Sequence, residues 1–193
     1  MNYDVILAGV GGQGVLSVAA IIALGAMKDG LVVRQSEVHG MAQRGGSVQA
    51  HLRLSDQIIV SDLIGKASAD MILSMEPIES LRYLAYLRAD GVLVSSTDPV
   101  KNIPTYPELE SIYAKIRGLP SARLVEAAAL AQQAGSARST NMVMVGAASA
   151  YLPVQEKSLL AAIEELFSRK GEKVVQVNRK AFQMGKETAA STV

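Results

Sequence analysis

A glycine-rich turn between an apolar strand and an apolar helix constrains this chain more than any other feature. Residues 3–8 are rich in branched aliphatic side chains, which is typical of a strand buried in a parallel sheet. The run GVGGQG at 9–14 fits G-x-G-x-x-G, and an almost uncharged stretch over 15–28 predicts a helix that ends at Gly30. Such glycines either let the backbone approach a phosphate at the helix N-terminus or only allow close packing of helix and strand. The turn alone leaves both interpretations open.

Strand and helix patterns alternate along the first two thirds of the chain. We expect further strands at 31–35, 47–54, 57–60, 70–75, 91–96 and 122–125, and helices at 78–88 and 106–116. The last third predicts helices at 127–134, 141–152, 156–168 and 173–188, with a tail that frays after Lys186. The first 35 residues then form one βαβ unit. The pattern predicts one α/β domain over 1–193, with a Rossmann-like, open, mostly parallel sheet, helices on both faces and a helical C-terminal third.

Composition removes several classes of function. Nineteen basic and 18 acidic residues give a net charge of +1, and aromatic residues make up 4%, so we expect no nucleic-acid partner. The longest apolar run is shorter than the roughly 20 residues that span a bilayer, and no secretory signal is recognised, so we expect a cytoplasmic protein without a membrane partner. The sequence has no cysteine, which excludes thiol nucleophiles and thiolate-bound iron–sulfur clusters within this chain.

A second concentration of reactive side chains lies in a predicted loop over 36–46. Loops after parallel strands emerge at the carboxyl edge of an open sheet, so we expect this loop beside the glycine turn. Arg44 and the amides of the next two glycines suit an anion or a partner's carboxylate, although Glu37 could pair with Arg44 instead. His39 is equally well explained as a hydrogen-bonded loop residue, and one histidine without cysteine predicts no metal site. The candidate binding residues are Gly11, Gly12, Gln13, Gly14, Glu37, His39, Arg44, Gly45, Gly46 and Asn141.

Asn141 enters that set because it begins a predicted helix. A helix N-terminus facing the crevice can receive a phosphate, although capping by Ser139, Thr140 or Asn141 explains the same residues. A dinucleotide would also need an acidic residue at the end of the second strand, about 20 residues after the turn. Arg34 and its neighbours occupy that position. A free-standing NAD(P)- or flavin-binding oxidoreductase, or a plain nucleotide-binding module, is therefore the alternative interpretation.

Four segments together carry a family resemblance. They are AGVGGQGVL at 8–16, SEVHGMAQRGGSVQAHLR at 36–53, DMILSMEPIESLRYLAYL at 70–87 and NMVMVGAASAYLP at 141–153. They resemble the gamma-type module of the 2-oxoacid:ferredoxin oxidoreductases over about residues 3–185. The resemblance is strongest to the members that act on indolepyruvate.

The resemblance implies an accessory subunit without redox groups or catalytic residues of its own. The enzyme would decarboxylate a 2-oxoacid, such as an aryl pyruvate, on thiamine diphosphate, pass electrons through iron–sulfur clusters to ferredoxin, and yield an acyl-CoA. Thiamine diphosphate and the clusters would belong to a large catalytic partner subunit, with ferredoxin an indirect partner. The residues themselves, apart from the resemblance, suggest the hypothesis that the two glycine loops form one edge, which docks on that subunit and helps shape the coenzyme A channel. A homodimer of the isolated chain is left open.

Overall fold

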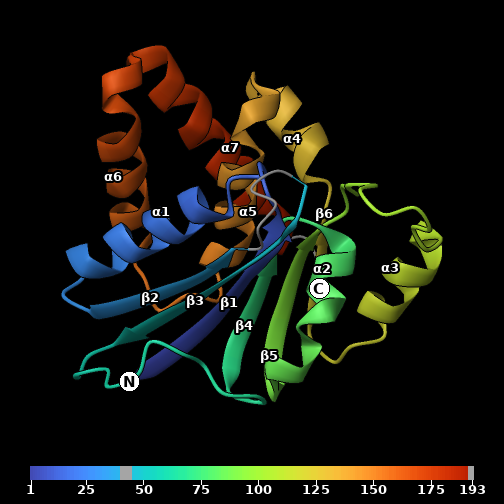
Figure 1. Cartoon of the computed structure of the whole chain (residues 1–193). Helices are drawn as coiled ribbons and strands as arrows, with labels where there is room; N and C mark the ends of the chain where they lie inside the picture. Colours follow the sequence, from blue (N-terminus) through green and yellow to red (C-terminus); the bar gives the residue numbers. More distant parts are fainter. Residues whose placement is uncertain (40–44, 191–193) are drawn as a thin grey trace.

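A six-stranded sheet forms the centre of the computed structural model, in which residues 1–39 and 45–190 are described. The strands are β1 (Asn2–Val10), β2 (Val32–His39), β3 (Ser47–Ser55), β4 (Ala69–Ser74), β5 (Leu87–Ser96) and β6 (Ala122–Val125). Their order is β2-β3-β1-β4-β5-β6 (Figure 1). Only β3 runs antiparallel to its neighbours, and the pairs β1–β4, β4–β5 and β5–β6 are parallel. The predicted mostly parallel α/β sheet is confirmed.

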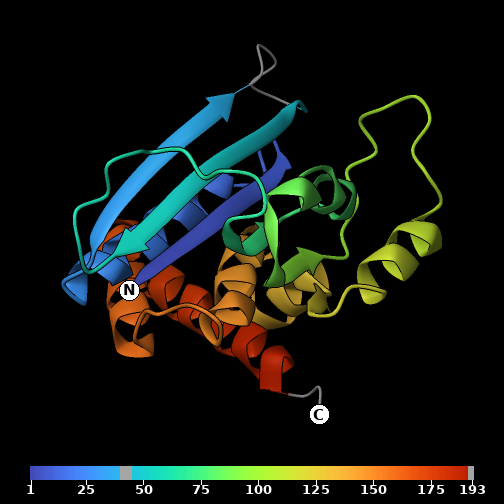
Figure 2. The same ribbon diagram turned by 90° about the horizontal axis from the view of Figure 1, so that it is seen from below.

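Helices cover both faces of the sheet, as predicted (Figures 1 and 2). One face carries α1 (Val15–Lys28), α4 (Ala127–Ala134), α5 (Thr140–Ser149), α6 (Glu156–Phe167) and α7 (Glu172–Ala190). The other carries α2 (Pro77–Arg82) and α3 (Leu109–Arg117). Short 3₁₀ turns lie at Leu84–Tyr86, Ala137–Ser139 and Ser168–Lys170. The four C-terminal helices begin within one residue of their predicted starts.

The central strands are apolar throughout because both faces are covered. In β1, Val5 and Leu7 enter the larger core under α1 and α5, whereas Ile6 enters the smaller core under α2 and α3. All three side chains are at most 1% exposed. A strand buried on both faces shows no alternation, and this explains the unbroken apolar run in the sequence.

Two glycines fix how α5 and α7 cross. A Cβ atom on Gly146 would lie 1.9 Å from the carbonyl oxygen of Phe182, and a Cβ on Gly185 would lie 1.9 Å from that of Val143. The two helix backbones therefore touch directly at a seam that admits no side chain. This seam holds α5 against the larger core, with the first turn of α5 at the carboxyl edge of the sheet.

The predicted βαβ unit over the first 35 residues needs correction. β2 does not end at Gln35 but pairs with β3 along its whole length, so Ser36, Glu37 and His39 belong to a strand and not to a loop. β1 and β2 are parallel to each other but are separated by the antiparallel β3. The alternating pattern of 47–54 predicts a strand, but it carries no information about where that strand inserts.

Other boundaries also differ from expectation. Residues 57–60 form no strand; they lie in the loop between β3 and β4. The helix predicted over 78–88 ends at Arg82, and β5 already begins at Leu87, while α3 starts at Leu109 instead of residue 106. The last helix, α7, continues to Ala190, two residues beyond its predicted end. Apolar side chains of α2 and of the start of β5 share the smaller core, so hydrophobic spacing alone could not separate them.

Candidate functional site

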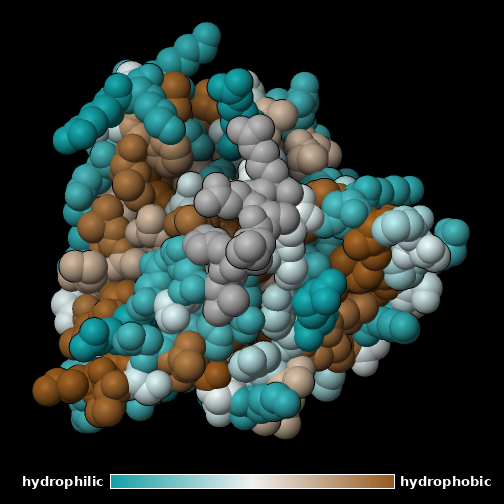
Figure 3. Space-filling view, viewed as in Figure 1, coloured by the Kyte–Doolittle hydropathy of each residue, from teal (hydrophilic) through white to brown (hydrophobic). Residues whose placement is uncertain are grey.

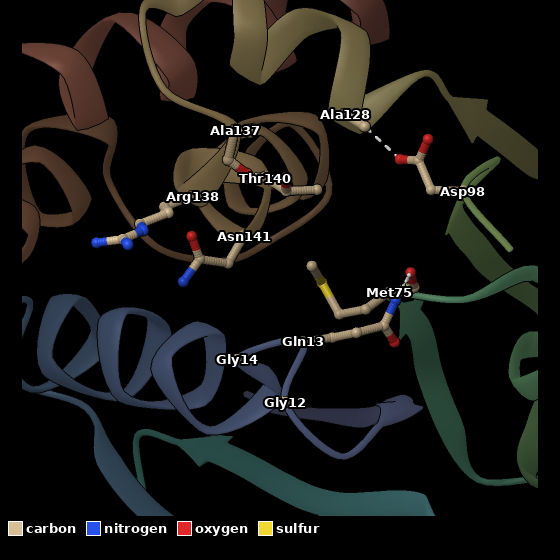
Figure 4. Close-up of a pocket in the computed structure, with 10 residues that line it drawn as sticks. All are labelled: Gly12, Gln13, Gly14, Met75, Asp98, Ala128, Ala137, Arg138, Thr140 and Asn141. Atoms are coloured by element: carbon tan, nitrogen blue, oxygen red, sulfur yellow. Dashed lines mark hydrogen bonds between the residues drawn. The ribbon is translucent and has the colours of Figure 1, made fainter. Parts of the chain in front are cut away.

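A cavity of about 430 Å³ lies where the connections out of the sheet diverge. β1 leads into α1 on one face, whereas its parallel neighbour β4 leads into α2 on the other. Ligands of open α/β sheets bind outside the carboxyl ends of the strands at such a switch point. The described residues that line the cavity are Gly12, Gln13, Gly14, Met75, Asp98, Ala128, Ala137, Arg138, Thr140 and Asn141 (Figure 4).

The glycine turn forms one wall of this cavity. Gly14 has a φ of 79° and is the N-cap residue of α1, and no side chain caps the helix there. Gln13 fixes the turn: its Oε1 accepts the Val10 amide at 2.8 Å, and its Nε2 donates to the Met75 carbonyl at 3.0 Å. The N-terminus of α1 is therefore held in place but left open toward the cavity. Partial positive charge at such a terminus favours an anion.

The bend at Gly45 and Gly46 lies against this turn, as the sequence predicts. The Gly11 amide donates to the Gly46 carbonyl at 2.8 Å, and the Gly45 amide donates to the Gly11 carbonyl at 3.3 Å. The side-chain amide of Asn102 donates to the Gly45 carbonyl. The expectation of outward-facing amides at the glycine pair is wrong for Gly45, because its N–H is used to tie the two bends together.

The opposite wall comes from the starts of α4 and α5. Asp98, just after β5, accepts the Ala128 amide at 2.8 Å and so caps α4 from outside the helix (Figure 4). α5 begins after Ser139, whose side chain does not cap it, and the Asn141 Oδ1 accepts the first-turn amide of Met142 at 3.1 Å. The Asn141 side chain lies over the glycine turn, with its Nδ2 atom 3.2 Å from the position of a Cβ on Gly14. The open N-terminus of α1 and the N-terminus of α5 thus face one cavity.

Arg138 adds a formal positive charge at this cavity. Its side chain is exposed at the rim, and it forms no ion pair with any residue in the described ranges. Asp98 is the one carboxylate among the described lining residues, and it is engaged by Ala128 and by the Ser96 hydroxyl at 2.7 Å. The two formal charges of the described lining therefore cancel, and its preference for an anion comes from the N-terminus of α1 and the exposed guanidinium of Arg138. Sequence reasoning missed Arg138, because no local pattern marks it.

Four described residues of the predicted set do not line this cavity: Gly11, Glu37, Gly45 and Gly46. Glu37 lies on β2, where its carboxylate accepts the Gln35 side-chain amide at 2.5 Å. The His39 backbone pairs with Val48, but the His39 side chain and the whole of Arg44 lie outside what is described. β3 also places the end of β2 two strands, or roughly 10 Å, from β1. A dinucleotide's ribose would need an acidic residue at the end of a strand next to β1, and β2 is not next to β1. This arrangement argues against the dinucleotide interpretation.

A buried carboxylate braces the loop above the site, and sequence reasoning did not single it out. Glu76 is 0% exposed and accepts hydrogen bonds from the amides of Glu79 (2.9 Å) and Val100 (3.3 Å) and from the Tyr106 hydroxyl. Burial, with the Glu76 carboxylate as the next cause, raises the pKa of Tyr106 above its usual value. Glu76 therefore anchors the segment that carries Asp98 to the end of β4.

Two searches of the described residues bear on other kinds of site. No three His, Asp or Glu side chains within residues 1–37, 45–188 are grouped as the ligands of a metal ion would be. None of the helices in this part of the chain is both long and apolar enough to cross a bilayer.

Fold and cavity together define a Rossmann-like α/β module with an anion-favouring site at the switch point of its sheet. A family model described as pyruvate ferredoxin/flavodoxin oxidoreductase matches residues 4–188. The chain therefore belongs to this family.

Relatives and solved structures agree with this assignment. The chain is 37% identical to indolepyruvate oxidoreductase subunit IorB of Archaeoglobus fulgidus, over 99% of this chain and 97% of the relative. It is 29% identical to 2-oxoglutarate synthase subunit KorC of Methanothermobacter marburgensis, over 97% of this chain and 96% of the relative. The gamma subunit of a keto/oxoacid ferredoxin oxidoreductase from Geobacter sulfurreducens matches with a TM-score of 0.73 at 28% identity, covering 98% of this chain and 99% of that one.

A fourth similarity concerns the fold alone. The 2-oxoglutarate:ferredoxin oxidoreductase of Magnetococcus marinus, solved with 2-oxoglutarate, coenzyme A and succinyl-CoA bound, matches with a TM-score of 0.80 at 22% identity. The match covers 100% of this chain but 32% of that one, so in that protein the same fold forms part of a longer polypeptide.

Proposed function

We propose that this chain is the small accessory subunit of a 2-oxoacid:ferredoxin oxidoreductase that acts on indolepyruvate or a similar aryl pyruvate. The relatives named as subunits of indolepyruvate oxidoreductases support this, because they match nearly the full length of the chain. Thiamine diphosphate and the iron–sulfur clusters would lie in a large partner subunit, since a chain without cysteine offers no thiolate to a cluster. Ferredoxin would then accept electrons from that partner and not from this chain.

The role proposed for this chain is to bind and orient coenzyme A, the acyl acceptor. The observation that carries the proposal is the cavity, where the uncapped N-terminus of α1, the start of α5 and Arg138 converge. The first-turn amides of α1 would bind a phosphate group, and the guanidinium of Arg138 would neutralise its remaining charge. The Asn141 side-chain amide would add a directional donor. Holding the phosphates here would leave the thiol end free to extend toward the partner's reaction centre.

Glu37, His39, Arg44, Gly45 and Gly46 belong to the same proposed site. Gly45 and Gly46 contact the glycine turn through backbone hydrogen bonds. Arg44 would supply a second cation for a phosphate or for a carboxylate of the partner subunit, and His39 and Glu37 would shape the rim.

The test is to replace Arg138 with alanine in the complex reconstituted with its large subunit. A hydrogen bond to a charged group contributes about 1.5–3 kcal/mol, and Arg138 is exposed, so we expect the low end: a roughly tenfold rise in the KM for coenzyme A. The KM for the 2-oxoacid and the turnover at saturating coenzyme A should stay unchanged. Arg169→Ala, an exposed arginine near the end of α6, is the matched control. An unchanged KM for coenzyme A in Arg138→Ala would refute the assignment.

A further inference from the structure

The loop between β3 and β4 exposes an unusual number of aliphatic side chains. Ile58 is 86% exposed, Val60 97% and Leu63 57%. In the space-filling view, apolar atoms gather at the corner of the molecule where this loop lies (Figure 3). Single exposed apolar residues need no explanation, but three within six residues mark an interaction surface.

The backbone of this loop is fixed in place. Arg53 on β3 donates from Nη1 to the carbonyls of Ser61 (3.0 Å) and Leu63 (3.2 Å), while its Nε and Nη2 bond to the Asp4 carboxylate at 2.8 and 3.0 Å. The Ile64 amide donates to His51 Nδ1 at 2.9 Å. The aliphatic side chains of Ile58, Val60 and Leu63 therefore point outward from an anchored segment.

Two isoleucines of the same loop are buried. Ile59 is 7% exposed and Ile64 is 3% exposed, so they anchor the loop from beneath. Because the inward positions are already filled by these isoleucines, the outward ones cannot turn into the core without displacing them. The exposed aliphatic surface is thus a property of the folded chain.

The sheet beneath the loop lacks a layer of helix. On this face α2 and α3 pack over β1, β4 and β5, while the loop alone crosses in front of β2 and β3 (Figure 2). Val32 on the edge strand β2 is 40% exposed, and neighbouring Arg34 lies 3.8 Å from Asp62 of the loop. The aliphatic loop and the edge of the sheet thus adjoin, and a domain of this type normally covers both faces.

We infer that this surface, formed by Ile58, Val60 and Leu63 with Val32 beside them, docks onto an apolar, uncharged surface of the large partner subunit. This inference rests on the proposed function. The charges at its rim cancel, since Arg34 faces Asp62 and the Met1 amino group lies 2.5 Å from Asp56, so the surface suits neither a polyanion nor a charged membrane. Relatives that match nearly the whole of this chain are named as subunits of an oxidoreductase, and this supports another subunit of the same enzyme as the occupant.

The docking surface and the cavity lie at opposite ends of β1. The loop begins at Asp56, beside Met1, whereas the glycine turn follows Val10. Substitutions in the loop should therefore leave the cavity intact, which lets the two proposals be tested separately.

The experiment is to capture the untagged chain with its tagged large subunit and compare the wild type with Val60→Glu and Ile58→Glu. Burying a carboxylate in an apolar contact is costly, so we expect at least a tenfold loss of affinity in either variant. The two side chains contact little within the chain, so the thermal midpoint of the isolated variants should stay within about 2 °C of wild type. Met27→Glu, at a methionine that is 60% exposed at the end of α1, should bind normally.

Each other outcome overturns a stated claim. Equal capture of wild type and both glutamate variants would overturn the docking surface while leaving the proposed function standing. Failure of the wild type itself to bind the large subunit would overturn the proposed function and the docking surface with it. Normal capture, together with a dimer of the isolated wild type that Val60→Glu dissociates, would assign the surface to a second copy of this chain and overturn the occupant proposed here.

Discussion

The seam between α5 and α7 makes Gly146→Ala the most sharply determined substitution in this chain. The new Cβ would lie 1.9 Å from the Phe182 carbonyl oxygen and 3.0 Å from the Lys186 amide nitrogen. Both are backbone atoms, so no side chain can rotate away, and the helices must separate by more than 1 Å to reach a normal contact. Overpacking a core typically costs 1–3 kcal/mol, and a backbone collision belongs at or above the upper end, about 3 kcal/mol.

This cost translates into a measurable shift. For a domain of this size each 1 kcal/mol lowers the thermal midpoint by roughly 2–4 °C, so Gly146→Ala should lower it by about 6–12 °C in calorimetry. Gly118→Ala is the control, because its Cβ would meet nothing closer than 3.4 Å and its φ of −75° suits alanine. A midpoint for Gly146→Ala within 2 °C of wild type would refute the packing of α5 on α7. Because α5 carries Asn141, the same variant should also weaken binding at the cavity.

Two further predictions address pH and the glycine turn. Burial and the charge of Arg53 lower the pKa of His51, so the unfolded chain binds a proton at His51 more readily than the folded chain does. The free energy of unfolding should therefore fall as the pH drops below about 6.5. In urea unfolding, the difference in this free energy between pH 7.5 and pH 5.5 should be smaller for His51→Asn than for wild type. A difference as large in the variant as in wild type would contradict this origin. Gly12→Ala and Gly14→Ala should each cost about 1–2 kcal/mol, because both glycines have positive φ. Only Gly14→Ala places its Cβ against Asn141, so coenzyme A affinity should fall more in that variant, and equal losses in the two would be inconsistent with the geometry.

Local chemistry made the strand–turn–helix start and the C-terminal helices predictable. The apolar composition of the strand before Gly9 and of the helix after Gly14 indicates that both are buried. The two glycine bends could be predicted to lie close together because β1 and β2 run in the same direction. What the sequence could not reveal depends on contacts between distant segments. The alternating pattern of 47–54 predicts a strand but does not predict that β3 pairs with β1. The residues around Gly146 likewise do not predict its contact with the Phe182 backbone in α7.

The residues of the candidate site also fall into those that local sequence predicts and those that depend on contacts between distant segments. The turn at 11–14 and Asn141 could be identified because each has a local signature, and Gly12, Gln13, Gly14 and Asn141 line the cavity. Arg138 and Asp98 were missed because their importance comes from where α4 and α5 begin relative to β5. Glu76 resembles an ordinary helix-capping residue in sequence, and its second role, holding Val100 and Tyr106, requires a loop that folds back from 24 to 30 residues away.

The location of coenzyme A in the assembled enzyme tests the central claim most directly. A structure of the complex of this chain with its large subunit, determined with coenzyme A bound, should place a phosphate group within hydrogen-bonding distance of the first-turn amides of α1 and of Arg138. Coenzyme A bound with all of its phosphates outside the cavity lined by Gly12–Gly14 and Asn141 would contradict the account.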